Sequence, residues 1–127
     1  MRRLTMWFVW VGALLTLIAG TALAGTTMTT GSGNDVLRGT SGPATLRAGS
    51  GNDALYGSGG ADRISGQSGK DKLNAGAGRD IILGGYGADT VYAKDGYVDI
   101  IDCGGGYDWV QHDAFDLVAG CEASFRF

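Results

Sequence analysis

The sequence has little of what enzymes and nucleic-acid-binding proteins commonly use. Its 127 residues include one histidine, two cysteines and one proline, and only 18% are charged. No histidine cluster or Cys-x-x-Cys motif is present, so the usual zinc sites are not indicated. A net charge of −3 provides no basic surface for nucleic acid or anionic lipid. We therefore expect no nucleic-acid partner.

Catalytic motifs are also missing. His112 stands beside Asp113, but no nucleophile motif accompanies them, and a histidine in this setting is more often a solvated or capping residue. The glycine-rich segments lack the Lys-Ser/Thr pair of a phosphate-binding loop. We predict that the chain is not an enzyme.

The first 24 residues differ in kind from the rest. Arg2 and Arg3 precede an apolar run over residues 6–19, and residues 22–24, Ala-Leu-Ala, have the small-x-small form of a cleavage site. These parts predict a signal peptide over 1–24, cleaved after Ala24, and then a short linker over 25–29. The alternative is an uncleaved membrane anchor. We expect a secreted, extracellular chain, free or associated with the cell surface, with no membrane contact after cleavage.

Beyond residue 24, large aliphatic residues are scarce and glycine is abundant. Of these 103 residues 22 are glycine, whereas leucine, isoleucine and valine together number 16. A conventional core is hard to build from so few large side chains. Eight basic against 13 acidic residues give a net charge of about −5, which favours cations as partners. Composition alone would also allow a disordered linker, so the decision rests on periodicity.

Residues 30–111 repeat every nine residues. Position 4 is glycine and position 6 is aspartate in all units but one, and position 8 is a large aliphatic residue. The units are TGSGNDVLR, GTSGPATLR, AGSGNDALY, GSGGADRIS, GQSGKDKLN, AGAGRDIIL, GGYGADTVY and, after a one-residue slip at Ala93, KDGYVDIID and CGGGYDWVQ. Position 8 is aliphatic in all nine: Leu37, Leu46, Leu55, Ile64, Leu73, Ile82, Val91, Ile101 and Val110. Chance does not produce such a column.

Each column has a physical role. Glycine permits positive φ and close backbone approach, so the first six residues of a unit can form a tight turn. The last three residues form a short strand with one aliphatic side chain pointing inward. One inward side chain per unit cannot make a core alone, so the units must stack. The sequence predicts an all-β solenoid.

Position 6 points to a metal. It is occupied by Asp35, Asp53, Asp62, Asp71, Asp80, Asp89, Asp99 and Asp108, with Ala44 as the exception. Stacked turns would bring these carboxylates close together, and a row of like charges opposes folding. A divalent cation between the turns removes the repulsion. Ca²⁺ suits such a site because it takes six to eight carboxylate and carbonyl oxygens in tolerant geometry.

This pattern resembles the repeats-in-toxin (RTX), or hemolysin-type, calcium-binding repeat, whose consensus is Gly-Gly-x-Gly-x-Asp-x-aliphatic-x. The resemblance implies a right-handed parallel β-roll in which two units complete one coil and alternate units stack on the same edge. It also implies Ca²⁺ ions between successive turns, held by position 6 carboxylates and turn carbonyls. The implied pairs are Asp35/Asp53, Asp53/Asp71, Asp71/Asp89 and Asp62/Asp80. The glycines implied in the turns of these sites are Gly33, Gly51, Gly60, Gly69, Gly78 and Gly87.

Some units depart from the pattern. Ala44 removes a carboxylate from the turn that should face Asp62, so we expect a weak or absent site there. Tyr97 occupies a glycine position after the slip, and Asp99 and Asp108 are either ligands or structural turn residues. Residues 99–108 and 120–122 resemble the end of short, stand-alone calcium-binding repeat proteins of actinobacteria.

The two cysteines, Cys103 and Cys121, are expected to form a disulfide because both belong to an exported chain. The disulfide would close a loop of roughly 18 residues and stabilise the folded chain by about 3 kcal/mol. The alternative is a metal or catalytic pair. We expect the disulfide to clamp a cap over 112–127, where the repeat stops and apolar residues gather.

Two functions remain in comparison. The first is a calcium-binding structural or surface module, whose folding is driven by ion binding and whose partner would be an extracellular protein or glycan. The second is an adhesin or ice-binding solenoid, which would show a ladder of one residue type on the outward position 7. That column is mixed, for example Arg63, Lys72, Ile81 and Trp109. The calcium module is favoured.

Overall fold

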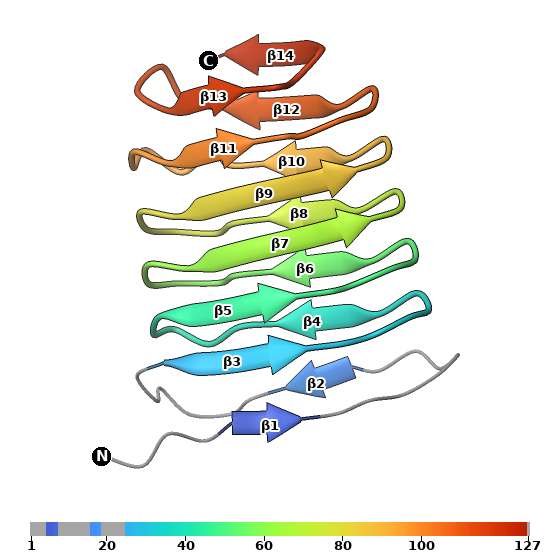
Figure 1. Cartoon of the computed structure of the whole chain (residues 1–127). Helices are drawn as coiled ribbons and strands as arrows, with labels where there is room; N and C mark the ends of the chain where they lie inside the picture. The colour runs from blue at the N-terminus through green and yellow to red at the C-terminus, as the bar shows by residue number, and fades with distance from the viewer. Residues whose placement is uncertain (1–4, 8–15, 19–24, 127) are drawn as a thin grey trace.

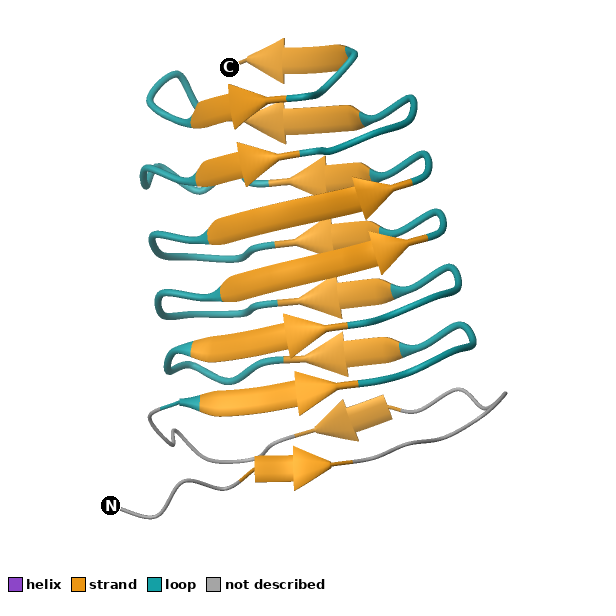
Figure 2. Ribbon diagram, viewed as in Figure 1, coloured by secondary structure: helices purple, strands orange, loops and turns teal. Residues whose placement is uncertain are grey.

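The chain forms a stack of flat coils, each with two short strands (Figure 1). The computed structural model describes residues 5–7, 16–18 and 25–126. The rest of the predicted signal peptide, including its cleavage site, lies outside the described residues. The described part contains strands and loops and no helix (Figure 2), so it offers no helical membrane span.

The strands form two parallel sheets. One sheet has the order β1 (Thr5–Trp7), β3 (Thr26–Thr29), β5 (Ala44–Arg47), β7 (Arg63–Ser68), β9 (Ile81–Tyr86), β11 (Ile100–Asp102) and β13 (Leu117–Ala119). The other has the order β2 (Thr16–Ile18), β4 (Val36–Arg38), β6 (Ala54–Tyr56), β8 (Lys72–Asn74), β10 (Thr90–Tyr92), β12 (Trp109–His112) and β14 (Ala123–Arg126). Odd strands pair with odd and even with even. Alternate units therefore stack on the same side, as a β-roll requires, and the predicted fold class is confirmed.

The aliphatic column of the repeat forms the core between the two sheets. All nine position 8 side chains are buried, with Leu37 at 2% exposure, Ile101 at 1% and the rest at 0%. Within each sheet they stack in register from one strand to the next, as Leu55 of β6 pairs with Leu73 of β8. Smaller buried residues such as Ala48, Ala75 and Cys103 complete this narrow core, so each coil is stabilised mainly by its neighbours.

The position 4 glycines, apart from Gly42 in the unit broken at Pro43, adopt the backbone conformation predicted for them. Positive φ values occur at Gly33, Gly51, Gly60, Gly69, Gly78 and Gly87. Stacking adds a second requirement, because a Cβ placed on Gly51 would collide with the carbonyl oxygen of Gly33 in the preceding coil. A side chain in this column would both strain the backbone and separate the coils.

Two residues carry positive φ without being glycine. Ser58 has φ +79° and Gln67 has φ +75°, both at position 2, where Gly76 and Gly85 stand in other units. We predict that Ser58→Gly and Gln67→Gly each stabilise the calcium-loaded protein by about 0.5–1 kcal/mol, because an L side chain is strained in this region. Chemical denaturation in excess calcium measures the effect. Ser50→Gly, at a position without positive φ, should destabilise, and equal gains from all three would contradict this explanation.

The sequence alignment placed the slip of the repeat at Ala93, and the structure corrects this position. Ala93 is buried and its N–H donates to the carbonyl of Gln111 at 2.8 Å, as the N–H of Ala75 donates to Tyr92. Ala93 is therefore an ordinary position 1, and the extra residue lies in the turn over 94–98. The turn accommodates the extra residue, so β11 stays in register with β9. The positive φ of this turn falls on Gly96, and Tyr97 is 52% exposed.

The C-terminal segment adds a strand to each sheet. β13 pairs in parallel with β11, and β14 pairs in parallel with β12. The predicted disulfide joins Cys103 to Cys121, with Cα atoms 5.2 Å apart. It links the start of the last nine-residue unit to the chain just before β14, so it holds the final coil against the roll.

Candidate metal centre

The position 6 aspartates form two rows, one along each edge of the roll. The first row contains Asp35, Asp53, Asp71, Asp89 and Asp108, and the second contains Asp62, Asp80 and Asp99. All eight are at most 3% exposed. The four aspartate pairs implied by the resemblance thus lie on successive coils of the same edge. Asp99 and Asp108 continue the rows beyond the slip.

Each aspartate also has a structural hydrogen bond that the sequence did not suggest. The N–H of Asp35 donates to Oδ1 of Asp53 at 2.8 Å, and the N–H of Asp53 donates to Oδ1 of Asp71 at 2.9 Å. The same bond recurs along both rows at 2.7–2.9 Å. One carboxylate oxygen therefore joins each coil to the coil before it.

The second oxygen of each carboxylate has no such partner. Oδ2 of all eight aspartates is buried without a hydrogen bond. Oδ2 of Asp62 lies so close to Gly57 that a Cβ on the glycine would stand 2.5 Å from it, and Asp89 faces Gly84 in the same way at 2.8 Å. Buried oxygens without a partner are costly, and they point into turns kept open by glycine. These residues fit a cation with oxygen ligands.

Burial shifts the titration of these groups. Loss of water raises the pKa of Asp62, Asp71 and Asp99 to about 7 and that of Asp80 and Asp89 to about 6. It also raises the pKa of Asp53 and Asp108. The backbone hydrogen bond to each carboxylate lowers the pKa in part, and neighbouring carboxylates raise it further. Without a cation the five carboxyl groups with a pKa of about 6 or 7 hold protons at a pH where ordinary aspartates are ionised.

At Pro43 and Ala44 the second row lacks a carboxylate, but its hydrogen bonds are not interrupted. The N–H of Ala44 still donates to Oδ1 of Asp62 at 2.8 Å, so the hydrogen-bond ladder is continuous. A hollow of about 210 Å³ lies beside the missing side chain, lined in part by Pro43, Ala44 and Arg63. The reduced binding expected at this turn stays a prediction.

Two ladder residues lie outside the nine-residue repeat. Asp116 Oδ1 accepts the N–H of Asp99 at 2.9 Å, and Glu122 Oε2 accepts the N–H of Asp108 at 2.9 Å. Each acts as the acceptor for the last aspartate of its row. Spacing could not reveal them, because Asp116 follows Asp99 by 17 residues and Glu122 follows Asp108 by 14.

Comparison with known proteins agrees with this geometry. The profile of the RTX calcium-binding nonapeptide repeat, which holds four copies of the repeat, matches residues 29–64, 38–73 and 65–97, more than half of the chain. The searches among curated proteins and among solved structures each gave no match. Ca²⁺ is the expected ligand of these repeats. With its two rows of buried aspartates on stacked glycine turns, the chain belongs to the RTX calcium-binding nonapeptide repeat family.

Proposed function

We propose that this chain folds outside the cell when Ca²⁺ binds between its stacked turns, and then serves as a structural or surface-interaction module without catalytic activity. The observation that carries the proposal is the set of eight buried Oδ2 atoms without a hydrogen-bond partner. A bound cation would satisfy these oxygens, and its binding free energy would then be largely folding free energy.

Position 6 carboxylates from successive coils would supply the charged ligands. The carbonyls of the glycine turns would supply the neutral ones, because Ca²⁺ accepts both kinds of oxygen in irregular geometry. The supporting evidence for an extracellular setting is the signal-like segment over 1–24 and the disulfide between Cys103 and Cys121.

The test is far-ultraviolet circular dichroism of residues 25–127 at neutral pH, in calcium and after removal of calcium with a chelator. We expect a β-rich spectrum in calcium and its loss on chelation, with recovery when calcium is restored. Magnesium in place of calcium is the control, since Mg²⁺ demands a tighter octahedral site. An identical folded spectrum with and without the chelator would reject calcium as the organising ion.

A further inference from the structure

One turn of the roll brings a third carboxylate to a position 6 pair. Asp80 and Asp99 belong to the second edge row, and Asp95 comes from the lengthened turn over 94–98. One oxygen from each of the three side chains lies within 4.8 Å of the other two. In the part of the chain that the structure describes, no other group of three acidic, cysteine or histidine side chains is this close.

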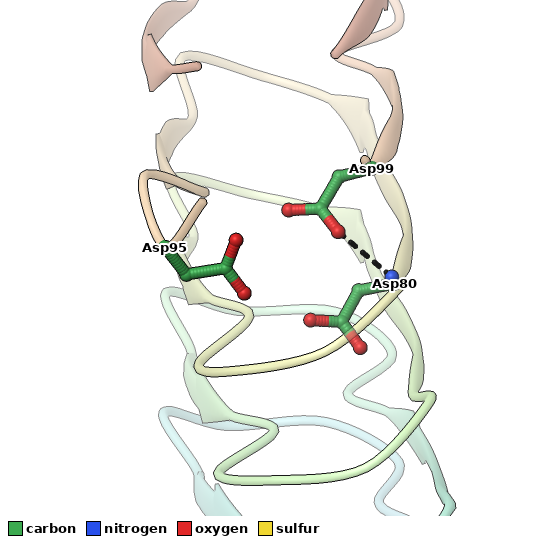
Figure 3. Close-up of side chains that lie close together, drawn as sticks. All are labelled: Asp80, Asp95 and Asp99. Atoms are coloured by element: carbon green, nitrogen blue, oxygen red, sulfur yellow. Dashed lines mark hydrogen bonds between the residues drawn. The ribbon is translucent and has the colours of Figure 1, made fainter. Parts of the chain in front are cut away.

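Figure 3 shows how the three side chains are arranged. Asp80 and Asp99 lie one above the other on one side of the turn, linked by the hydrogen bond from Asp80 N–H to Asp99 Oδ1, and Asp95 faces them from the opposite side. Asp80 is 1% exposed and Asp99 is 0% exposed. Their Oδ2 atoms have no hydrogen-bond partner and point toward Asp95.

Asp95 supplies a hydrogen-bond acceptor that a backbone carbonyl supplies in turns of the first edge. On the first edge, the N–H of Gly51 donates to the carbonyl of Ser68, and that of Gly69 donates to the carbonyl of Tyr86. The equivalent N–H in the coil before the lengthened turn, that of Gly78, donates to Oδ2 of Asp95 at 2.8 Å instead. In the lengthened turn the acceptor is thus a charged oxygen, whereas the turns of the first edge use a neutral one.

The lengthened turn is held firmly enough to position this carboxylate. Asp95 Oδ1 accepts the N–H of Tyr97 at 2.7 Å. From the next coil, Asp113 Oδ2 accepts the N–H groups of both Asp95 and Gly96, at 2.9 and 2.6 Å. A carboxylate oxygen has more than one lone pair, so these hydrogen bonds leave Asp95 able to bind a cation as well.

We propose that Asp80, Asp95 and Asp99 form a three-carboxylate cation site, and that this site fills before the two-carboxylate sites of the regular turns. The proposal rests on the proposed calcium function and goes further by assigning a ligand outside the nonapeptide pattern. Calcium affinity rises with the number of charged ligands and with the rigidity of the site. The lengthened turn is therefore a gain for binding, although it departs from the repeat.

The test uses Asp95→Asn, which keeps the side-chain size and one of the two acceptor oxygens but removes the charge. Asp102→Asn is the matched control: Asp102 is exposed, also accepts an N–H two residues on, from Gly104, and lies outside the cluster. In calorimetric calcium titrations of residues 25–127, we expect Asp95→Asn to weaken the tightest step by about ten-fold or more, and Asp102→Asn to leave it unchanged.

Terbium at one equivalent per chain gives a second readout. Luminescence lifetimes in H₂O and D₂O count the waters on the bound ion, and loss of a protein ligand admits water. We expect about one more water in Asp95→Asn than in the wild type or Asp102→Asn. If Asp95→Asn does not fold in excess calcium, Asp95→Ser replaces it, because serine also accepts a hydrogen bond in a turn.

The outcomes separate this site from the proposed function. Equal titrations and equal hydration for the Asp95 and Asp102 variants, with calcium binding intact in the wild type, would overturn the three-carboxylate site alone. No binding of calcium or terbium by the wild type would overturn the proposed function as well.

Discussion

Replacing Asp53 and Asp71 together by asparagine should abolish folding at calcium concentrations that fully fold the wild type. The two residues are interior members of the first edge row, so the change removes a charged ligand from three successive pairs, Asp35/Asp53, Asp53/Asp71 and Asp71/Asp89. With several sites weakened at once, we expect the calcium midpoint of folding to rise by on the order of ten-fold or more. Circular dichroism during a calcium titration measures the midpoint.

Asparagine separates the two roles of these aspartates. Its Oδ1 can still accept the N–H of the preceding coil, so the hydrogen-bond ladder persists while the charge is lost. The double alanine variant loses both and should be at least as impaired. Asp102→Asn, which removes an exposed charge away from both rows, should leave the midpoint unchanged. A double asparagine variant that folds at the wild-type midpoint would show that the rows serve only as hydrogen-bond acceptors.

Acidification should have opposite effects on the calcium-free and calcium-loaded protein. In the calcium-free roll, the pKa of Asp62 and Asp71 lies at about 7, against 3.8 for an ordinary aspartate. The folded state then binds more protons than the unfolded chain between about pH 4 and pH 7, so its stability falls as the pH rises through this window. For a single carboxyl moved from pKa 3.8 to about 7, the loss is about 4 kcal/mol.

The free-energy losses of several such groups together are of the same order as the stability of a small domain, which is roughly 5–15 kcal/mol. We therefore expect the calcium-free chain to be unfolded at pH 7.5 and to gain β-structure as the pH falls towards 4. In calcium the direction reverses, because the ion binds the ionised form and competes with protons. Calcium affinity should fall as the pH drops from about 7 to 5, with protons released on binding. Circular dichroism and calorimetry in buffers of different ionisation enthalpy measure both effects, and a calcium affinity independent of pH would contradict this account.

The nine-residue period made the core and the edges predictable. A strict aliphatic column identified the nine large core side chains from Leu37 to Val110, and the aspartate column identified both rows, because position in the unit fixes position in the coil. The glycine column likewise predicted positive φ at Gly33 and Gly51. These features depend on local sequence and on stacking of like units, and both are visible in a single chain.

The remaining site residues could not be found in this way, because they are placed by contacts between coils of unequal length. The N–H of Asp95 reaches Asp113 because the turn over 94–98 has an extra residue, and Glu122 contacts the N–H of Asp108 from a shorter coil. Sequence reasoning gave Asp113 no role, yet it holds the lengthened turn. The positive φ of Ser58 and Gln67 was also missed, since neither residue type indicates it.

The ladder of carboxylates gives the molecule a direction. Each side chain completes the coil before it and does nothing for the backbone of the coil after it, as Asp53 does for Asp35. Shortening from the amino end would leave a carboxylate oxygen that water can solvate. Shortening from the carboxyl end, before Asp116 and Glu122, would remove the acceptors of the Asp99 and Asp108 N–H groups and leave water to replace them. Asp116 and Glu122 thus close the two rows, and a coil inserted after residue 108 would have to supply an acceptor in their place.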